Sequence, residues 1–516
     1  MPDGNAPETG GSLQTGGSLQ TVGSFQTGGS LQTGSADDPL KAHGTTGAQD
    51  TIDAQDTTDA QDTTDAQDTP DAQDTTRARS TARARAVIAA SRPASPAGHL
   101  VGDTLLVAET AQLFGLSDKQ AAELGDAFVS GRGDPALAAF GIVALPIAET
   151  RPGPVRALAL TVAQSCNMAC SYCYAAGGDF GGASKAMPLE VAQRAIDGLV
   201  GDAPPGGAVR IAFMGGEPLV ARKLIRQCVD YANRRAAARA VSVGFSITTN
   251  GTLLTPDDAQ FFVDHAFAVT VSIDGGRRAQ NLLRPMRGGS ASFDRIATRI
   301  EPLLQSADRI ALSARVTATP DNLDLPEIVA DLAALGFRSV GVSPLIASAT
   351  RQGELNGTGF EALLEAMMAC GDAWMQAAAR GEHHPFANLE TALRELHRGK
   401  ARSQSCGAAR DYLSVDADGR FAACHRFVND PLGAMGDLSS GIDAERRSAW
   451  LAERSVTRQS PCQSCWARAL CGGGCHHEVL HRGRPACDYV RGWLHYAIGA
   501  YRSLIDARPE WFDAPR

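Results

Sequence analysis

Three cysteines stand close together in the stretch CNMACSYCY, with the spacing C-x3-C-x2-C: Cys166, Cys170 and Cys173. Thiolates on one short loop are the ligands of iron–sulfur clusters and of structural zinc sites, and both kinds of site usually take four ligands. Three cysteines without a fourth nearby therefore predict a cluster in which one iron is open to an outside ligand. The alternative for the same residues is a zinc site with a distant fourth ligand.

A second set of cysteines lies in the C-terminal part of the chain. Its seven members are Cys406, Cys424, Cys462, Cys465, Cys471, Cys475 and Cys487. The N-terminus lacks a basic region followed by an apolar stretch, so we expect a cytoplasmic protein, in which such groups are more often metal ligands than disulfides. The remaining two cysteines, Cys228 and Cys370, stand alone within helical patterns and are predicted to be small buried residues.

Apolar runs typical of buried strands alternate with amphipathic helical segments from residue 155 onward. The strands are expected at residues 156–162, 208–214, 241–248, 267–273, 309–316 and 338–345. The helices are expected at residues 187–201, 219–239, 255–264, 291–306, 323–335 and 358–380, with a closing helix at 488–505. Six β/α units predict an α/β fold built as a partial (β/α)6 TIM-like barrel. Chemistry in such barrels gathers at the C-terminal ends of the strands, where the first three cysteines stand.

The cysteine loop resembles that of the radical S-adenosylmethionine (radical SAM) superfamily. The spacing C-x3-C-x2-C, with the aromatic Tyr172 before the last cysteine, stands at the end of the first strand of a partial barrel, as in that family. The resemblance implies a [4Fe–4S] cluster on these cysteines whose open iron binds S-adenosylmethionine. One electron then cleaves the sulfonium bond and gives a 5′-deoxyadenosyl radical, so that the cofactor carries the difficult chemistry.

Further positions match elements of the same family. FMGGEPL at 213–219 resembles its glycine-rich element, in which glycines let the backbone approach the methionine moiety and a glutamate pairs with its ammonium group. TTNG at 248–251 and VSIDG at 271–275 match loops near the nucleoside, and an arginine late on the fifth strand is expected at the methionine carboxylate. The implied cofactor contacts are Tyr172, Gly215, Gly216, Glu217, Asn250, Ser272, Asp274 and Arg315.

The C-terminal cysteines resemble the SPASM extension of peptide-modifying radical enzymes, which carries two auxiliary iron–sulfur clusters. By that resemblance Cys406, Cys424 and Cys475 hold the first cluster, and Cys462, Cys465, Cys471 and Cys487 hold the second. Seven thiolates leave one position short, and the missing ligand could be water, the substrate or a side chain such as His425, His476 or His477. Two zinc ribbons are the alternative interpretation of the same cysteines.

The resemblance implies a peptide or protein substrate and a reducing partner such as ferredoxin or flavodoxin. Anaerobic sulfatase maturases carry an aspartate directly after the cysteine that matches Cys424, whereas this chain has His425 there. They also usually carry an extra cysteine shortly after the one that matches Cys406, and CGAARDY has none. We therefore expect a thioether or carbon–carbon crosslink, as in six-cysteine peptide maturases and the quinohemoprotein amine dehydrogenase maturase. Sulfatase-maturase-type side-chain oxidation and radical chemistry on a small molecule are the alternatives.

Composition divides the chain into parts. Residues 1–95 carry the repeats GSLQTG and AQDTTD, which lack the apolar residues that offset ordering entropy, so we expect a disordered tail. Residues 96–150 form a small appendage that either binds a leader peptide by adding an edge strand or packs on the barrel as a cap. Residues 151–350 are the barrel, 351–400 a helical linker and 401–516 the SPASM domain.

Charge and hydropathy narrow the classes of protein. The net charge of −9 comes from residues 1–76, which hold thirteen acidic residues and one basic residue, so the remainder carries only about +3. Such a weak positive charge, without alternating basic and aromatic residues, argues against a nucleic-acid binder. The sequence also has no apolar run of 18 residues, the length that would indicate a membrane-spanning helix. An electron-carrier protein would have many cysteines too, but it would not need the GGE element or six β/α units.

Overall fold

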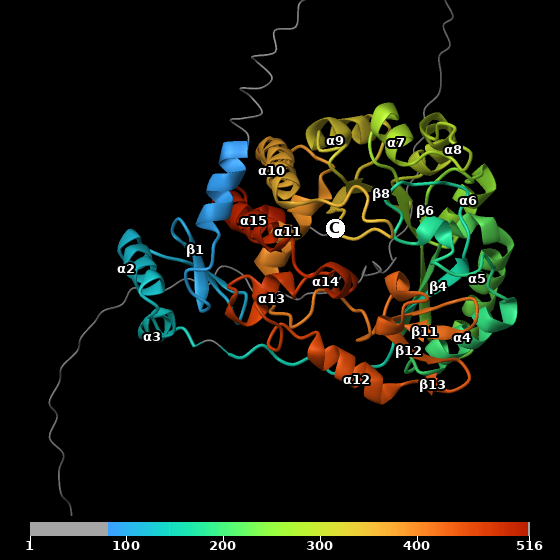
Figure 1. Cartoon of the computed structure of the whole chain (residues 1–516), viewed down its shortest axis with the longest axis horizontal. Coiled ribbons are helices and arrows are strands. Elements are labelled where there is room, and N and C mark those ends of the chain that lie inside the picture. The colour runs from blue at the N-terminus through green and yellow to red at the C-terminus, as the bar shows by residue number, and fades with distance from the viewer. Residues whose placement is uncertain (1–80, 144, 514–516) are drawn as a thin grey trace, which may run out of the picture.

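The computed structural model describes residues 81–143 and 145–513, so the repeats of the predicted tail lie outside the described residues (Figure 1). Residues 81–90 are helical, so this part of the predicted tail, which the sequence extends to residue 95, is folded. Ion pairs hold this helix on α10 (Gly357–Ala379): Arg83 with Asp372 at 2.5 Å and Arg85 with Glu361 at 2.8 Å. The sequence around Arg83 and Arg85 gives no sign of these partners, because Asp372 and Glu361 lie far along the chain.

Six parallel strands form the partial barrel, in the order of the chain. They are β4 (Ala157–Ala163), β5 (Ala208–Gly215), β6 (Ser242–Thr249), β7 (Ala268–Ser272), β8 (Ala311–Ala318) and β9 (Val340–Pro344). The helices that cover them are α4 (Leu189–Gly201), α5 (Arg222–Ala237), α6 (Pro256–Asp264), α7 (Arg277–Leu283), α8 (Phe293–Leu304) and α9 (Leu325–Ala334) (Figure 1). The predicted six β/α units are confirmed, and the short α7 is an addition that the sequence pattern did not reveal.

Alternation along each strand sets the two faces of the barrel. In β8, for example, Leu312, Ala314 and Val316 are buried in the main hydrophobic core, whereas Arg315 between them is not. Because successive side chains of a strand point to opposite faces, the apolar set meets the helices and the polar set faces the interior of the barrel. The isolated Cys228 and Cys370 lie in the same core, as the sequence predicts.

The C-terminal cysteine-rich region shares a sheet with the barrel. Strand β10 (Tyr412–Val415) pairs in parallel with β4, and β11 (Arg420–Ala422), β12 (Ala434–Asp437) and β13 (Gly441–Ile442) extend the sheet beyond it. The sequence predicts a separate domain from about residue 401, but the sheet of ten strands runs across that boundary. Parallel pairing between strands some 250 residues apart leaves no trace in local patterns.

Helices complete the C-terminal part. They are α11 (Ala387–Arg398), α12 (Ala444–Glu453), α13 (Arg468–Cys471), α14 (His476–Arg482) and α15 (Cys487–Ala507). The long α15 packs against α10 and α11, so the predicted helical linker is part of the packed body (Figure 1). Within the described residues, none of the helices combines the length and apolar character needed to cross a membrane.

A small N-terminal unit lies on the far side of the C-terminal helices from α4, α5 and α6 (Figure 1). It consists of β1 (Gly98–Val101), β2 (Thr104–Val107), β3 (Leu113–Gly115), α2 (Asp118–Val129) and α3 (Gly133–Ala139), with a core of its own. The Trp466 indole donates to the Ser91 carbonyl at 2.8 Å and stacks on the ring of His99 at 4.0 Å. The unit therefore contacts the cysteine-rich region.

Arg447 provides a test of the packing between the barrel and the cysteine-rich region. Its buried guanidinium donates to the carbonyls of Ala409, Gly153 and Arg410 at 2.6, 2.6 and 2.5 Å. Arg447→Met keeps the apolar stem but leaves the carbonyls of Ala409 and Gly153 without this donor, while the Arg410 carbonyl keeps the Gly153 amide, so we expect a loss of about 3 kcal/mol in the free energy of unfolding. Chemical denaturation followed by circular dichroism measures it. Ser448→Ala, at an exposed position of the same helix, is the matched control and should change stability little.

Candidate functional site

The loop with the first three cysteines leaves the C-terminal end of β4 and is held there by the end of β5. The amide of Gly216 donates to the Ala163 carbonyl at 2.9 Å, and the amide of Glu217 donates to the Ser165 carbonyl at 2.9 Å. Two consecutive residues of the GGE element, Gly216 and Glu217, thus bind Ala163 and Ser165, which come shortly before Cys166 in the chain. The backbone of β5 therefore fixes where the cysteine loop begins.

Close backbone packing explains why glycines stand at this place. A Cβ on Gly215 would lie 2.3 Å from the Ala163 carbonyl oxygen, and one on Gly216 would lie 2.4 Å from that of Ser165. Gly178, at φ +108°, would place a Cβ 2.8 Å from the Cβ of Cys166. The sequence predicts that Gly215 and Gly216 allow a close approach to the cofactor; within the described residues, the close approach is to the cysteine loop itself.

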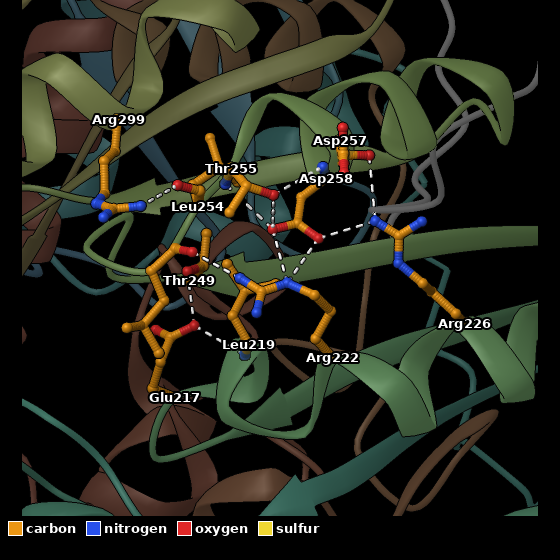
Figure 2. A network of polar contacts seen from close by, with 11 residues as sticks. Glu217, Leu219, Arg222, Arg226, Thr249, Leu254, Thr255, Asp257, Asp258 and Arg299 are labelled. Atoms are coloured by element: carbon orange, nitrogen blue, oxygen red, sulfur yellow. Dashed lines mark hydrogen bonds and ion pairs between the residues drawn. The ribbon is translucent and has the colours of Figure 1, made fainter.

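Glu217 is fully buried and ties the end of β5 to the end of β6. One carboxylate oxygen accepts from the Leu219 amide at 3.0 Å and the Thr249 hydroxyl at 2.7 Å (Figure 2). The other accepts from the Asn250 amide at 2.7 Å. Burial raises the pKa of Glu217, while these hydrogen bonds oppose the rise. The Oε2 atom, which holds a single hydrogen bond, is the part of this carboxylate that has capacity for a ligand.

Asn250 reaches from the end of β6 to the cysteine loop. Its side-chain amide donates to the Asn167 Oδ1 atom at 3.0 Å and lies 3.8 Å from the Cys166 sulfur. The following loop is pinned by arginines: Arg222 donates to the Leu253 carbonyl at 2.6 Å and Arg299 donates to that of Leu254 at 2.9 Å (Figure 2). The buried carboxylate of Asp258 accepts from Arg222 and Arg226 and keeps α5 and α6 in register with this loop (Figure 2).

Tyr172 and Asp274 bind each other. The Tyr172 hydroxyl donates to the Asp274 carboxylate and accepts from Arg284 at 2.6 Å, while the Thr317 amide donates to the second oxygen of Asp274 at 2.8 Å. Burial raises the pKa of Asp274, and the charge of Arg284 opposes that rise. Both residues are predicted cofactor contacts; in the structure they fasten the cysteine loop to the ends of β7 and β8.

Ser272 and Arg315 face each other in the register of β7 and β8, and so project from the same face of the barrel. The Arg315 guanidinium contacts the Ser343 hydroxyl, and burial lowers the pKa of Arg315, helped by the charge of Arg426. Arg426 itself pairs with Glu478 at 2.7 Å. The two arginines and one glutamate leave a net positive charge, which suits an anionic group such as a carboxylate.

The first three cysteines form one set of free thiols. Burial raises the pKa of Cys170 to about 11, and charges on Cys173 and Cys166 add to it. Burial likewise raises the pKa of Cys166. Because thiolates in such surroundings are costly without a cation, the set fits a metal cluster that supplies the positive charge, and three close ligands match the donor set of an iron–sulfur centre with one open iron.

The seven C-terminal cysteines separate into two further sets. Burial raises the pKa of Cys424 to about 12, and the charges that add to it come from Cys475 and Cys406. Burial raises the pKa of Cys462 to about 11, and there the added charges come from Cys471, Cys487 and Cys465. The resemblance implies the same groupings, and the role of these cysteines as cluster ligands stays a prediction. The set with Cys462 and also Cys475, a member of the Cys424 set, line a cavity of about 260 Å³ between α13, α14 and α15.

Tyr174 lies between the first thiol set and the Cys424 set. Burial raises the pKa of its hydroxyl, and charges on both Cys173 and Cys424 raise it further. Its ring lies 6.0 Å from that of His425, whose Nδ1 atom is 3.0 Å from the Tyr412 hydroxyl. The barrel site and the cysteine-rich region are therefore adjacent across two tyrosines.

The candidate auxiliary ligands His425, His476 and His477 lie in different surroundings. Burial lowers the pKa of His425 to about 4, so its imidazole is neutral at physiological pH. His476 packs on Trp450 and His477 on Phe427, with ring centroids 4.9 and 5.1 Å apart. Their roles as cluster ligands stay predictions.

Sequence reasoning missed several residues of this site. Arg284, Arg426 and Glu478 carry its electrostatics, and Tyr174 and Tyr412 bridge its two halves. Arg284 follows the unpredicted α7, and Arg426 and Glu478 pair across 52 residues. Tyr174 is the last residue of the motif CSYCY and directly follows Cys173, and this position is the signal in the sequence that could have indicated it.

Comparison with known proteins agrees with this geometry. Residues 160–306, which run from β4 into α8, match the Radical SAM superfamily. The chain carries a radical SAM domain. The predicted radical SAM domain and the α/β barrel fold are thereby confirmed, and the protein is an enzyme.

Individual relatives extend beyond that domain. The serine-type anaerobic sulfatase-maturating enzyme of Klebsiella pneumoniae is 26% identical over 372 residues, which cover 69% of this chain and 91% of the relative. The solved structure of native anSMEcpe with bound AdoMet superposes with a TM-score of 0.58 at 18% identity, over 68% of this chain and 98% of that one. The structure of the same protein with bound AdoMet and Cp18Cys peptide gives 0.54 at 18% identity, over 70% and 98%.

The packing of Gly216 on the cysteine loop yields a paired test. Gly216→Ala inserts a methyl group against the Ser165 backbone, so the radical SAM chain is expected to lose stability and to retain less iron after anaerobic reconstitution. Gly198→Ala, in α4 with open space around it, is the control and should be neutral or stabilising by up to about 1 kcal/mol. Thermal unfolding and iron analysis measure both effects. Equal iron content and stability in the two variants would contradict the packing argument.

Proposed function

We propose that the radical SAM chain modifies a ribosomally made peptide or a protein by abstracting a hydrogen atom and closing a crosslink. The observation that carries this proposal is the adjacency of the first thiol set and the Cys424 set across Tyr174, with the first set at the mouth of a barrel. A hydrogen-abstracting centre beside further redox-capable thiol sets fits a net oxidation of the substrate. The relatives named as sulfatase-maturating enzymes support a peptide or protein as substrate.

Residues of the barrel supply the binding site for the first cofactors. Cys166, Cys170 and Cys173 would hold a [4Fe–4S] cluster, and Ser272 with Arg315 would bind the carboxylate of S-adenosylmethionine. When bound, the cluster and S-adenosylmethionine together supply hydrogen-atom abstraction from carbon. The free capacity of the Glu217 Oε2 atom suits the ammonium group of the same molecule, while Tyr172, Asn250 and Asp274 act by holding the cysteine loop in place.

The cysteine-rich region supplies the second half of the reaction. The Cys406, Cys424 and Cys475 set and the Cys462, Cys465, Cys471 and Cys487 set would hold two auxiliary iron–sulfur clusters. A new carbon–sulfur or carbon–carbon bond removes two hydrogens from the peptide: one leaves as a hydrogen atom, and the other as a proton plus one electron. A cluster held by these cysteines would supply an acceptor for that electron, and a reduced carrier such as ferredoxin or flavodoxin would deliver the electron that starts each turnover.

Sulfatase-type side-chain oxidation is the second candidate, because the curated relatives above are sulfatase-maturating enzymes. It needs a base beside the reacting carbon. This chain offers the neutral imidazole of His425, which faces Tyr174 and Tyr412 at the junction of the two halves. A crosslinking enzyme needs the same space for the sulfur or carbon partner, so the product decides between the two reactions.

The N-terminal unit is a site for the unmodified part of a substrate peptide. In the described part of the chain β3 has a partner on one side only, so its second edge is available for an added strand. Val129, Val143 and Leu145 are large hydrophobic residues exposed on this unit, with 81%, 76% and 67% of their surface accessible. We propose leader binding there in preference to a packing role.

The first test concerns cofactor cleavage. Cys173→Ala removes one ligand of the proposed first cluster, so the reconstituted enzyme should lose production of 5′-deoxyadenosine from S-adenosylmethionine by at least about 100-fold. Cys228→Ala, a buried cysteine outside the three sets, should retain it. Anaerobic assay with dithionite and liquid chromatography measures the product. Full activity in Cys173→Ala, or zinc in place of iron in the wild type, would contradict the proposal.

The second test separates the two reactions. We expect co-expression with a peptide encoded beside the gene to give a product lighter by two hydrogens, with linked side chains in the fragmentation spectrum. A sulfatase-motif peptide should stay unmodified in the same assay. An aldehyde on that peptide, detected by hydrazide labelling and lost in His425→Ala, would favour the second candidate.

A further inference from the structure

Three metal-ligating side chains meet outside the thiol sets. The ligand atoms of Asp430, His477 and His481 all lie within 4.8 Å of one another. His477 and His481 are four residues apart on α14 and therefore lie on one face of it. Asp430 comes from the turn that follows Phe427, between β11 and β12.

Each ligand atom is oriented by its surroundings. The Asp430 Oδ2 atom lies 2.7 Å from the His481 Nε2 atom, while its Oδ1 accepts from the Leu432 amide at 3.0 Å, which fixes the carboxylate. The ring of His477 lies 4.5 Å from that of His481 and packs edge-on against Phe427. The Nδ1 atom of His477 is buried and has no hydrogen-bond partner within the described residues. A buried imidazole nitrogen without a partner costs free energy, and a metal ion bound at that nitrogen would recover it.

We propose that Asp430, His477 and His481 bind one divalent transition metal ion of the zinc class. Two imidazole nitrogens and one carboxylate oxygen are a zinc donor set, and a water completes the tetrahedron. The His481 side chain is 33% exposed and that of Asp430 is 16% exposed, so the ion can enter from solvent. This site is separate from the thiol sets and does not depend on the proposed reaction.

The geometry points to a structural ion rather than a hydrolytic one. Residues 477–481 read H-E-V-L-H, a pattern in which the glutamate can act as a general base beside zinc. Here Glu478 pairs with Arg426 at 2.7 Å, and so its carboxylate is committed to that ion pair. A structural role follows from where the ligands stand in the sequence. Asp430 follows Cys424 by six residues, and His477 follows Cys475 by two. An ion between them joins the two segments that carry Cys424 and Cys475.

The experiment uses the full chain, reconstituted anaerobically with iron and sulfide and then titrated with zinc chloride. Elemental analysis after desalting should find one zinc per chain in the wild type, and zinc X-ray absorption should show nitrogen and oxygen neighbours without sulfur. His481→Ala, at an exposed position, should weaken zinc binding by at least about 100-fold with unchanged iron content. Asp430→Asn should weaken it too, and His383→Ala, an exposed histidine elsewhere, should not.

Three outcomes would overturn the assignment: no zinc retained by the wild type, equal zinc affinity in His481→Ala and His383→Ala, or sulfur in the zinc spectrum. The last would place zinc in a cysteine set instead. Each of these leaves the radical reaction untouched, since 5′-deoxyadenosine formation is measured separately. Loss of that activity with intact zinc binding would affect the proposed function alone.

Discussion

The contact between the ends of β4 and β5 is the constraint on which the candidate site depends. Two glycines lie against the backbone of Ala163 and Ser165 at distances that leave no room for a methyl group. The cysteine loop and the GGE element therefore move as one body. Strands β6, β7 and β8 add further contacts: β6 through Glu217 and Asn250, and β7 and β8 through Asp274 and Tyr172. The loop is thus fixed by most of the barrel rather than by its own sequence.

The pairing of β10 with β4 extends the same constraint into the cysteine-rich region. Because β10 continues the barrel sheet, the turn that carries Cys424 comes to lie beside the loop that carries Cys173. Tyr174 and Tyr412 fill the space between them. A radical reaction that ends in electron loss needs its acceptor near the reacting carbon, and a shared sheet holds that distance more firmly than two domains joined by a linker would.

The repeating elements of the fold could be predicted from the sequence because their signals are local. Six buried strands and the helices between them follow from apolar runs and helical periodicity, and the thiol sets follow from spacing together with family resemblance. Contacts across long separations could not be found in this way. The pairing of β10 with β4, the ion pair of Arg426 with Glu478 and the helix at 81–90 each depend on a partner far along the chain. No local pattern distinguishes such residues from ordinary surface groups.

The predicted cofactor contacts divide into two physical kinds that residue type alone does not separate. Asp274 and Tyr172 are polar residues at strand ends, as a ligand site requires, but their hydrogen bonds are already used within the protein. Ser272 and Arg315 share a register position on the barrel face, and Arg315 meets a hydroxyl rather than a carboxylate. The Arg315 guanidinium is open to the barrel interior and pairs with no carboxylate within the described residues, so the free energy gained by a bound carboxylate is largest at Arg315. The strongest ligand contact in the site is therefore expected at Arg315, a residue that stands outside the FMGGEPL, TTNG and VSIDG motifs.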